Sequence, residues 1–215
     1  MARVVIVDWE SLHFMCRILG IGKLNFRGLY QVLAHKIGTS DLHKRPVCVL
    51  PPHRRETIGK SLQTAGFEVV APEGGEKPDD AYIIDYLSKL QSPEVTEVVL
   101  VSADQDFAPV LLGKSMTVHW VATRARNDEG KTMVASALEE VFEAEERFNF
   151  VELKDYQDLI MREPARPRPP IETPSDGRRL KISLEAGVDT DSIAFLRALL
   201  RLIQSYPDVR YTIEG

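Results

Sequence analysis

Short continuous apolar runs alternate with longer amphipathic stretches over the first two thirds of the chain. Five of these runs are rich in β-branched residues and are predicted to be strands: RVVIV at 3–7, PVCVL at 46–50, EVVAP at 68–72, TEVVLVS at 96–102 and TVHWVAT at 117–123. The segments between them carry apolar residues at helical spacing. Strands without polar alternation are buried on both faces, so this order predicts a mainly parallel sheet covered by helices on both sides.

The pattern changes after about residue 124. The stretch ASALEEVFEAEERFNFVEL, residues 135–153, begins as an acidic helix, and we expect it to pack back on the sheet through Val141, Phe142 and Phe148. Residues 1–160 are therefore predicted to form one α/β domain.

Residues 161–179 are expected to be a semi-rigid linker, because they include five prolines in a short polar run rich in arginine. Residues 180–215 have the pattern strand, helix, strand, a short C-terminal β-α-β segment that is too small to be stable alone. We expect this segment to dock, to form a homo-oligomer or bind a protein partner, or to be the start of a longer unit.

Composition limits the possible partners and the compartment. The 215-residue chain has a formal net charge of −5, so nucleic acid could be bound only through a local basic patch. Cys16 and Cys48 are far apart and lack CxxC spacing, which favours buried free thiols in a reducing compartment. No apolar stretch approaches the length of a membrane span, and the N-terminal run stops at Asp8. These features predict a cytoplasmic protein with no membrane contact.

Aspartates follow the ends of separate predicted strands. Asp8 follows the first strand, Asp104 and Asp106 follow the fourth, and Asp79 and Asp80 open the helix between the third and the fourth. In a parallel sheet these positions share one edge. Clustered carboxylates repel one another unless a cation lies between them, and hard oxygen ligands favour Mg²⁺ or Mn²⁺. Such a site can activate water for attack on a phosphodiester, whereas a single aspartate there is more often a helix cap.

Other residues near this edge have two open interpretations. Ser102 could orient a ligand or simply fit a tight turn, and Trp9 and Phe107 could stack on a base, although core positions are more common for such residues. Basic residues follow the second and fifth strands, where they could bind RNA phosphates or serve only solubility; they are Arg54, Arg55, Arg124, Arg126 and Lys131.

Three motifs together resemble the NYN domain, a branch of the PIN-like nucleases. They are VIVDWESLHF at 5–14, EKPDDAYIIDYL at 76–87 and VVLVSADQDFAPVL at 98–111, and the last is the most specific, with its S-x-D-x-D-F followed by a small residue and proline. The resemblance covers roughly residues 2–153. It implies a Rossmann-like, three-layer α/β/α fold of the PIN-like type and metal-dependent ribonuclease activity. By position, Asp8 matches the first-strand acid, Asp104 and Asp106 the fourth-strand pair, and Asp79 or Asp80 the acid that opens the middle helix.

The chain departs from the family pattern at two places. Ser11 stands where many members have asparagine, and the acid expected before the closing F-x-x-L element corresponds to Glu145 or Glu146, near Phe148.

The sequence thus predicts a ribonuclease that uses Mg²⁺ or Mn²⁺ bound by its aspartates and that contacts RNA through Ser11, Ser102 and the basic residues. The alternative is a catalytically inactive module of the same fold that binds RNA or protein. A phosphohydrolase is less favoured, because Asp8 is followed by Trp9 and Glu10 instead of the D-x-D that aspartyl phosphatases use.

Overall fold

The computed structural model describes residues 2–91, 93–127, 129–162, 180–183 and 211–214. The chain divides into two compact units, Met1–Pro164 and Ala165–Gly215. In the second unit, β8 (Leu180–Ser183) and β9 (Tyr211–Glu214) pair in parallel. The helix predicted between these two strands, and the predicted linker from residue 163 onward, lie outside the described residues.

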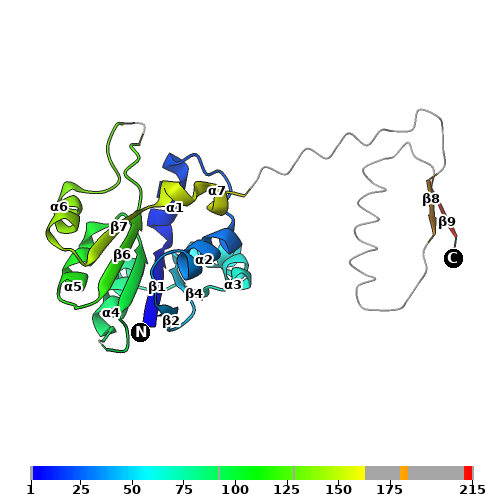
Figure 1. The fold of residues 1–215 in the computed structure, drawn as a ribbon. Helices are drawn as coiled ribbons and strands as arrows, with labels where there is room; N and C mark the ends of the chain where they lie inside the picture. The colour runs from blue at the N-terminus through cyan, green and yellow to red at the C-terminus, as the bar shows by residue number, and fades with distance from the viewer. Residues whose placement is uncertain (1, 92, 128, 163–179, 184–210, 215) are drawn as a thin grey trace. The chain divides into compact units, whose positions relative to one another are not determined.

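The first unit is built on a seven-stranded sheet (Figure 1). Its strands are β1 (Ala2–Asp8), β2 (Asp41–Leu42), β3 (Val47–Val49), β4 (Glu68–Val70), β5 (Glu97–Val101), β6 (Thr117–Ala122) and β7 (Phe148–Glu152). They lie in the order β4-β3-β1-β5-β6-β7, with β2 paired to the start of β1, and all pairs are parallel. The predicted parallel sheet is confirmed.

Helices cover both faces of this sheet (Figure 1). On one face lie α1 (Trp9–Ile18), α2 (Phe26–His35), α3 (Lys60–Ala65) and α7 (Gln157–Ile160), and on the other α4 (Pro78–Lys89), α5 (Ala108–Leu112) and α6 (Ser136–Ala144). Shorter helical segments are η1 (Pro52–Arg54), η2 (Arg55–Gly59), η3 (Gln105–Phe107) and η4 (Leu153–Tyr156). The expected three-layer, Rossmann-like α/β/α fold is therefore confirmed. Within the described ranges, no helix has the length and apolar character needed to cross a membrane.

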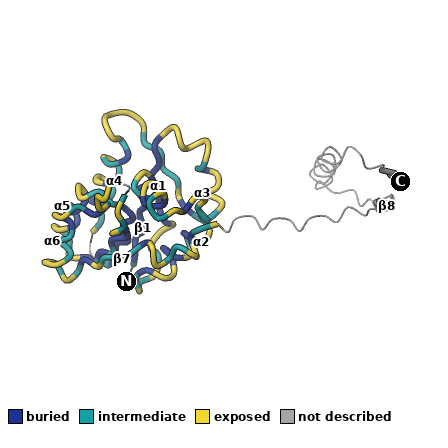
Figure 2. The backbone as a smooth tube through the Cα atoms, turned by 90° about the horizontal axis from the view of Figure 1, so that it is seen from above, coloured by how far each residue is buried: buried dark blue, intermediate teal, exposed yellow. Residues whose placement is uncertain are grey.

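The core follows the central strands. Nearly every residue of β1, β3 and β5 is buried, because helices exclude water from both faces of the sheet. Figure 2 shows this burial along the middle of the unit, with exposed residues on loops and outer helix faces. Cys16 and Cys48 are free thiols within this core. Burial raises the pKa of Cys16 to about 12, so its thiol is protonated at neutral pH.

Two parts of the fold differ from the sequence prediction. The region between the first two predicted strands contains two helices, α1 and α2, and the two-residue strand β2. The acidic helix near the end of the unit stops at Ala144, and Phe148–Glu152 forms the edge strand β7. In β7, buried Phe148 is followed by exposed Asn149, since an edge strand is only partly covered. After α7 the chain runs beside the loop that precedes α2: the backbone N–H of Arg162 donates to the carbonyl of Lys23, and Met161 forms an isolated antiparallel β-bridge with Leu24.

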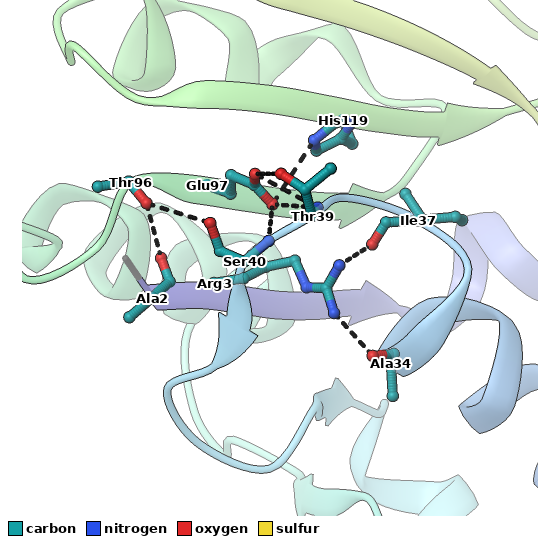
Figure 3. A network of polar contacts seen from close by, with 9 residues as sticks. All are labelled: Ala2, Arg3, Ala34, Ile37, Thr39, Ser40, Thr96, Glu97 and His119. Atoms are coloured by element: carbon teal, nitrogen blue, oxygen red, sulfur yellow. Dashed lines mark hydrogen bonds and ion pairs between the residues drawn. The ribbon is translucent and has the colours of Figure 1, made fainter.

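Arg3 lies buried at the amino edge of the sheet, the edge where the strands begin (Figure 3). Its guanidinium donates hydrogen bonds to the carbonyl oxygens of Ala34, at 2.7 Å, and Ile37. These carbonyls lie in and just after the last turn of α2, where helix carbonyls lack internal partners and carry partial negative charge. Arg3 therefore ties the end of α2 to the first strand.

Glu97 lies opposite Arg3 on the neighbouring strand and is also buried. Burial would raise the pKa of Glu97, but hydrogen bonds from Thr39 and Ser40 outweigh burial and hold it below its usual value. His119 Nε2 lies 3.9 Å from Glu97 Oε2 (Figure 3). Burial lowers the pKa of His119; the negative charge of Glu97 opposes this shift, and the charge of Arg3 adds to it.

Because the pKa of His119 is lower in the folded chain than in the unfolded chain, the unfolded chain binds its proton first as the pH falls. We expect the free energy of unfolding to decrease below about pH 6.5, by at most about 1.4 kcal/mol per pH unit for this one proton. Urea unfolding at several pH values between 7.5 and 5.5 measures this slope. The variant His119→Gln should have a shallower slope, whereas His43→Gln, at an exposed position, is the control. Equal slopes for all three proteins would contradict the assignment to His119.

Candidate functional site at the carboxyl edge of the sheet

The strand order reverses direction at β1. From β1 the chain builds β3 and β4 on one side and then returns to build β5, β6 and β7 on the other. In doubly wound sheets of this kind, ligands bind in the crevice outside the carboxyl ends of the strands where the order reverses. Asp8 ends β1, and Asp104 follows β5 after two intervening residues. Both aspartates therefore lie at the position where this topology leaves a crevice.

Asp8 is a buried carboxylate, only 4% exposed. Its Oδ1 accepts the backbone N–H of Ser11 at 3.3 Å and so caps the N-terminus of α1, while its Oδ2 accepts the hydroxyl of Ser102 at 2.9 Å. Burial raises the pKa of Asp8, the hydrogen bonds from Ser11 and Ser102 partly oppose this shift, and the charge of Asp79 adds to it. Among the described residues Asp8 forms no ion pair, so its charge is stabilised by hydroxyl and amide groups alone.

Ser102 connects several parts of this site. It is completely buried, and its Oγ donates to Asp8 and accepts the backbone N–H of Asp104 at 3.0 Å. The Ser11 and Ser102 hydroxyl oxygens are 3.1 Å apart. Since the Ser102 proton is directed to Asp8, Ser11 is the donor in this pair. The backbone carbonyl of Ser102 accepts the indole N–H of Trp120 at 2.6 Å, so a core side chain fixes this turn.

A second pair of carboxylates comes from the first turn of α4. Asp79 is 9% exposed and Asp80 is half-buried. Burial raises the pKa of Asp80, Lys77 opposes this shift, and the charges of Asp79 and Asp104 add to it. These mutual effects mean that the aspartates of α4 lie within electrostatic range of Asp8 and of Asp104.

Lys77 is a cation at this edge that the sequence analysis missed. Its Nζ lies 3.4 Å from Asp80 Oδ2, and the pKa of Lys77 is raised by Asp80 first and then by the charges of Asp104 and Asp106. Lys77 has a left-handed backbone, with φ of 49°, and directly precedes Pro78 in the first turn of α4. The only sequence signal that could have indicated Lys77 is its position directly before Pro78, a residue type that often begins a helix.

Asp104 and Asp106 begin the short helix after β5. Asp104 Oδ1 accepts the backbone N–H of Asp106 at 2.9 Å and so caps η3. Asp104 is half-buried and Asp106 is exposed, whereas Phe107 is fully buried in the core. The core interpretation of Phe107 is thus the one that the structure supports. Asp104 also caps a helix, as expected of a single aspartate. Only its Oδ1 is used in the cap, so Oδ2 is available to another partner.

The five aspartates gather at one edge, but they do not form a closed metal cage. Within the described ranges, no three His, Cys, Asp or Glu side chains make a group that could hold a metal ion by themselves. Mg²⁺ ordinarily keeps several waters and is bound through one or two carboxylates together with substrate phosphates. Asp8, buried within electrostatic range of Asp79 and without an ion-pair partner in the part of the chain that the structure describes, fits that manner of binding. Glu145 and Glu146 precede β7 and therefore lie at the amino edge, away from this site.

The predicted RNA-binding cations are placed differently from one another. Arg54 and Arg55 are exposed in η1 and η2. Arg124 makes two hydrogen bonds to Glu139, at 2.7 and 2.6 Å, and its guanidinium carbon lies 3.8 Å from the centre of the Phe150 ring. Arg124 is therefore engaged within the fold.

Arg126 and Lys131 are exposed on the loop between β6 and α6, which extends beyond the sheet (Figure 1). An isolated bridge between Arg126 and Thr132 shapes this loop. Lys131 pairs with Glu129 at 3.1 Å. Glu152, at the carboxyl end of β7, accepts the backbone N–H of Arg124 at 3.0 Å and is an acid at this edge that the sequence analysis did not select.

Comparisons with known proteins agree with the fold and add no function. No protein-family profile matches the chain, and no curated protein sequence matches it. A crystal structure of a protein of unknown function from Vibrio parahaemolyticus is similar, with a TM-score of 0.52 and 19% sequence identity. The match covers 72% of this chain and 94% of that one. At this level of identity, the similarity establishes the α/β fold alone.

The burial of Asp8 generates a stability prediction. Because burial and the neighbouring Asp79 disfavour its charged form, Asp8→Asn should stabilise the metal-free chain at neutral pH by about 0.5–2 kcal/mol. The amide oxygen can still cap α1. Thermal unfolding in EDTA measures the change, and Asp106→Asn, at an exposed carboxylate, is the matched control, with an expected change within about 0.5 kcal/mol. A lower melting temperature for Asp8→Asn would show that Asp8 is mainly a structural cap.

Proposed function

We propose that the protein is an Mg²⁺- or Mn²⁺-dependent ribonuclease of the NYN, PIN-like type. The observation that carries this proposal is Asp8: a buried carboxylate at the end of the central strand, beside Asp79, with no ion-pair partner among the described residues. Stability alone does not favour such a group, because the hydrogen bonds from Ser11 and Ser102 only partly offset the cost of burying its charge. The order of the three sequence motifs supports the same assignment.

In this proposal one or two of Asp8, Asp79, Asp80 and Asp104 contact the ion directly and the others act through its bound waters, while Asp106 lies at the exposed margin. A bound ion supplies positive charge that lowers the pKa of a coordinated water and stabilises the leaving oxygen at a phosphodiester. Ser102 fixes Asp8 and the backbone of Asp104 through hydrogen bonds, and Ser11 completes that arrangement.

Lys77 has two roles in this proposal. Without an ion or substrate it pairs with Asp80, and it compensates part of the negative charge of this edge. When a phosphodiester enters, its flexible ammonium group can bind a phosphate oxygen. RNA phosphates would otherwise contact Arg54, Arg55, Arg126 and Lys131, whereas Arg124 would act through the loop that it anchors to Glu139.

A second candidate function is a catalytically inactive module of this fold that binds RNA or protein. The observation that favours it is that no three acidic, histidine or cysteine side chains of the described residues form a metal-holding group. The substitution of serine for the usual asparagine at Ser11 points the same way.

Cleavage of a labelled RNA in Mg²⁺, in Mn²⁺ and in EDTA tests the proposal. We expect cleavage with either metal and none in EDTA. Asp8→Asn and Asp104→Asn should each lower the rate at least about 100-fold, since each would remove a few kcal/mol of transition-state stabilisation. The control is Asp85→Asn, because Asp85 is exposed on α4 and pairs with Lys89 at 2.6 Å.

The outcomes separate the two candidates. Cleavage that persists in EDTA, or in both variants, would contradict the proposed site. RNA binding without any cleavage would favour the inactive module. Melting temperature gives an independent measurement of ion binding: Mg²⁺ or Mn²⁺ should raise it in the natural chain and not in Asp104→Asn.

A further inference from the structure

Two hollows lie along α1 next to the aspartate site. Their volumes are about 440 Å³ and 410 Å³, within the range of ordinary ligand pockets. Trp9 and His13 line both hollows, so the hollows adjoin at these two residues on the first turns of α1. We call the two hollows together the α1 groove and define it by Trp9, His13, Phe14, Arg17, His53 and Arg54.

Aromatic rings form the floor of the α1 groove. The rings of Trp9 and His13 are nearly parallel, 10° apart, with centres at 6.0 Å. Trp9 is 7% exposed, and its ring centre lies 5.9 Å from that of Phe26, so packing holds the indole in place. His13 is exposed next to it. Phe14, the next residue, is 44% exposed, although large apolar side chains are ordinarily buried. Core packing therefore sets the orientation of the Trp9 ring, and the exposed rings of His13 and Phe14 offer faces to a planar group in the groove.

Basic residues border these rings. Arg17 lines one hollow and Arg54 lines the other, together with His53, and Glu10 is the one acidic residue among the lining side chains. The chain as a whole carries a formal net charge of −5, so this basic and aromatic surface stands out locally. Rings that can stack on bases, combined with guanidinium groups that can bind phosphates, are the features with which proteins bind single-stranded nucleic acid.

Ser11 connects the groove to the aspartate site. Ser11 lines the second hollow, and the same residue contacts Ser102 through its hydroxyl and Asp8 through its backbone N–H. Met133, from the loop that carries Arg126 and Lys131, lines this hollow as well.

We propose that the α1 groove binds unpaired bases of single-stranded RNA, with Arg17 and Arg54 on the adjacent phosphates. The inference rests on the proposed function for the identity of the substrate, and it goes further by locating a base-binding surface along α1, outside the aspartates. In a duplex the base faces are covered by neighbouring base pairs, so they cannot stack on His13 or Phe14. The groove therefore selects single strands over duplexes.

The first test measures binding in EDTA, where the proposed cleavage cannot occur. A fluorescein-labelled single-stranded RNA and the duplex of the same sequence are titrated by anisotropy with the full chain. The single strand should bind more tightly, and the double variant His13→Ala, Phe14→Ala should weaken that binding about 10- to 100-fold. The control is Leu112→Ala, because Leu112 is 37% exposed on α5, which covers the other face of the sheet.

Two further measurements locate the RNA. Trp120 is fully buried, so quenching of tryptophan emission by RNA would report on Trp9. Arg54→Gln should make the dependence of log Kd on log salt concentration shallower by about 0.7, the value for one phosphate contact on a single strand.

The results distinguish this inference from the nuclease proposal. Metal-dependent cleavage with RNA affinity unchanged in the double variant would overturn the groove and leave the nuclease intact. Loss of RNA affinity in the double variant, together with no cleavage by the natural chain under any condition, would support the groove and overturn the nuclease proposal. Equal affinity for single strand and duplex would also overturn the inference, and the exposed rings would then be better explained as a protein contact.

Discussion

Hydrogen bonding along both edges of β1 is the constraint on which the rest of the first unit depends. β3 and β5 pair with opposite sides of this strand, so the connections after it must leave in opposite directions and open a crevice at its carboxyl end. The run from Val4 to Val7 is buried on both faces, so the specific polar contacts at the two ends of β1 anchor its register. Arg3 bonds to the end of α2 at one end, and Asp8 bonds to Ser11 and Ser102 at the other.

Much of the fold could be predicted from the sequence, because central parallel strands are apolar on both faces and leave a clear signal. The elements that were missed are those whose residues carry weaker signals. β2 has only two residues and depends on its pairing with β1. β7 is an edge strand, and because it includes the exposed polar residue Asn149, its sequence is hard to distinguish from the end of the preceding acidic helix. The division between α1 and α2 is also hidden, since the loop between them includes the buried residue Ile21 and is not strongly polar.

The position of the aspartates could be predicted in the same way, since strand ends in a parallel sheet share an edge. The partners of each side chain could not. Whether Arg124 is free or engaged depends on Glu139, fifteen residues later, and on Phe150 beneath it. The pairing of Lys77 with Asp80 depends on a left-handed backbone before Pro78. Trp9 and His13 are one helical turn apart, but only the fold shows that both border open space.

The cap of α1 gives the site a mechanical property. The same carboxylate that lies at the end of β1 holds the backbone of Ser11, and the first turn that it holds contains Trp9. A ligand that displaced Asp8 Oδ1 from the Ser11 N–H would loosen this turn, whereas a ligand that bound Oδ2 alone would leave the cap intact. In the first case, binding at the carboxylate and binding on the surface of α1 would be coupled, and each would change the affinity of the other by the same factor. The position of Asp8 between a strand end and a helix start is what makes such coupling physically available.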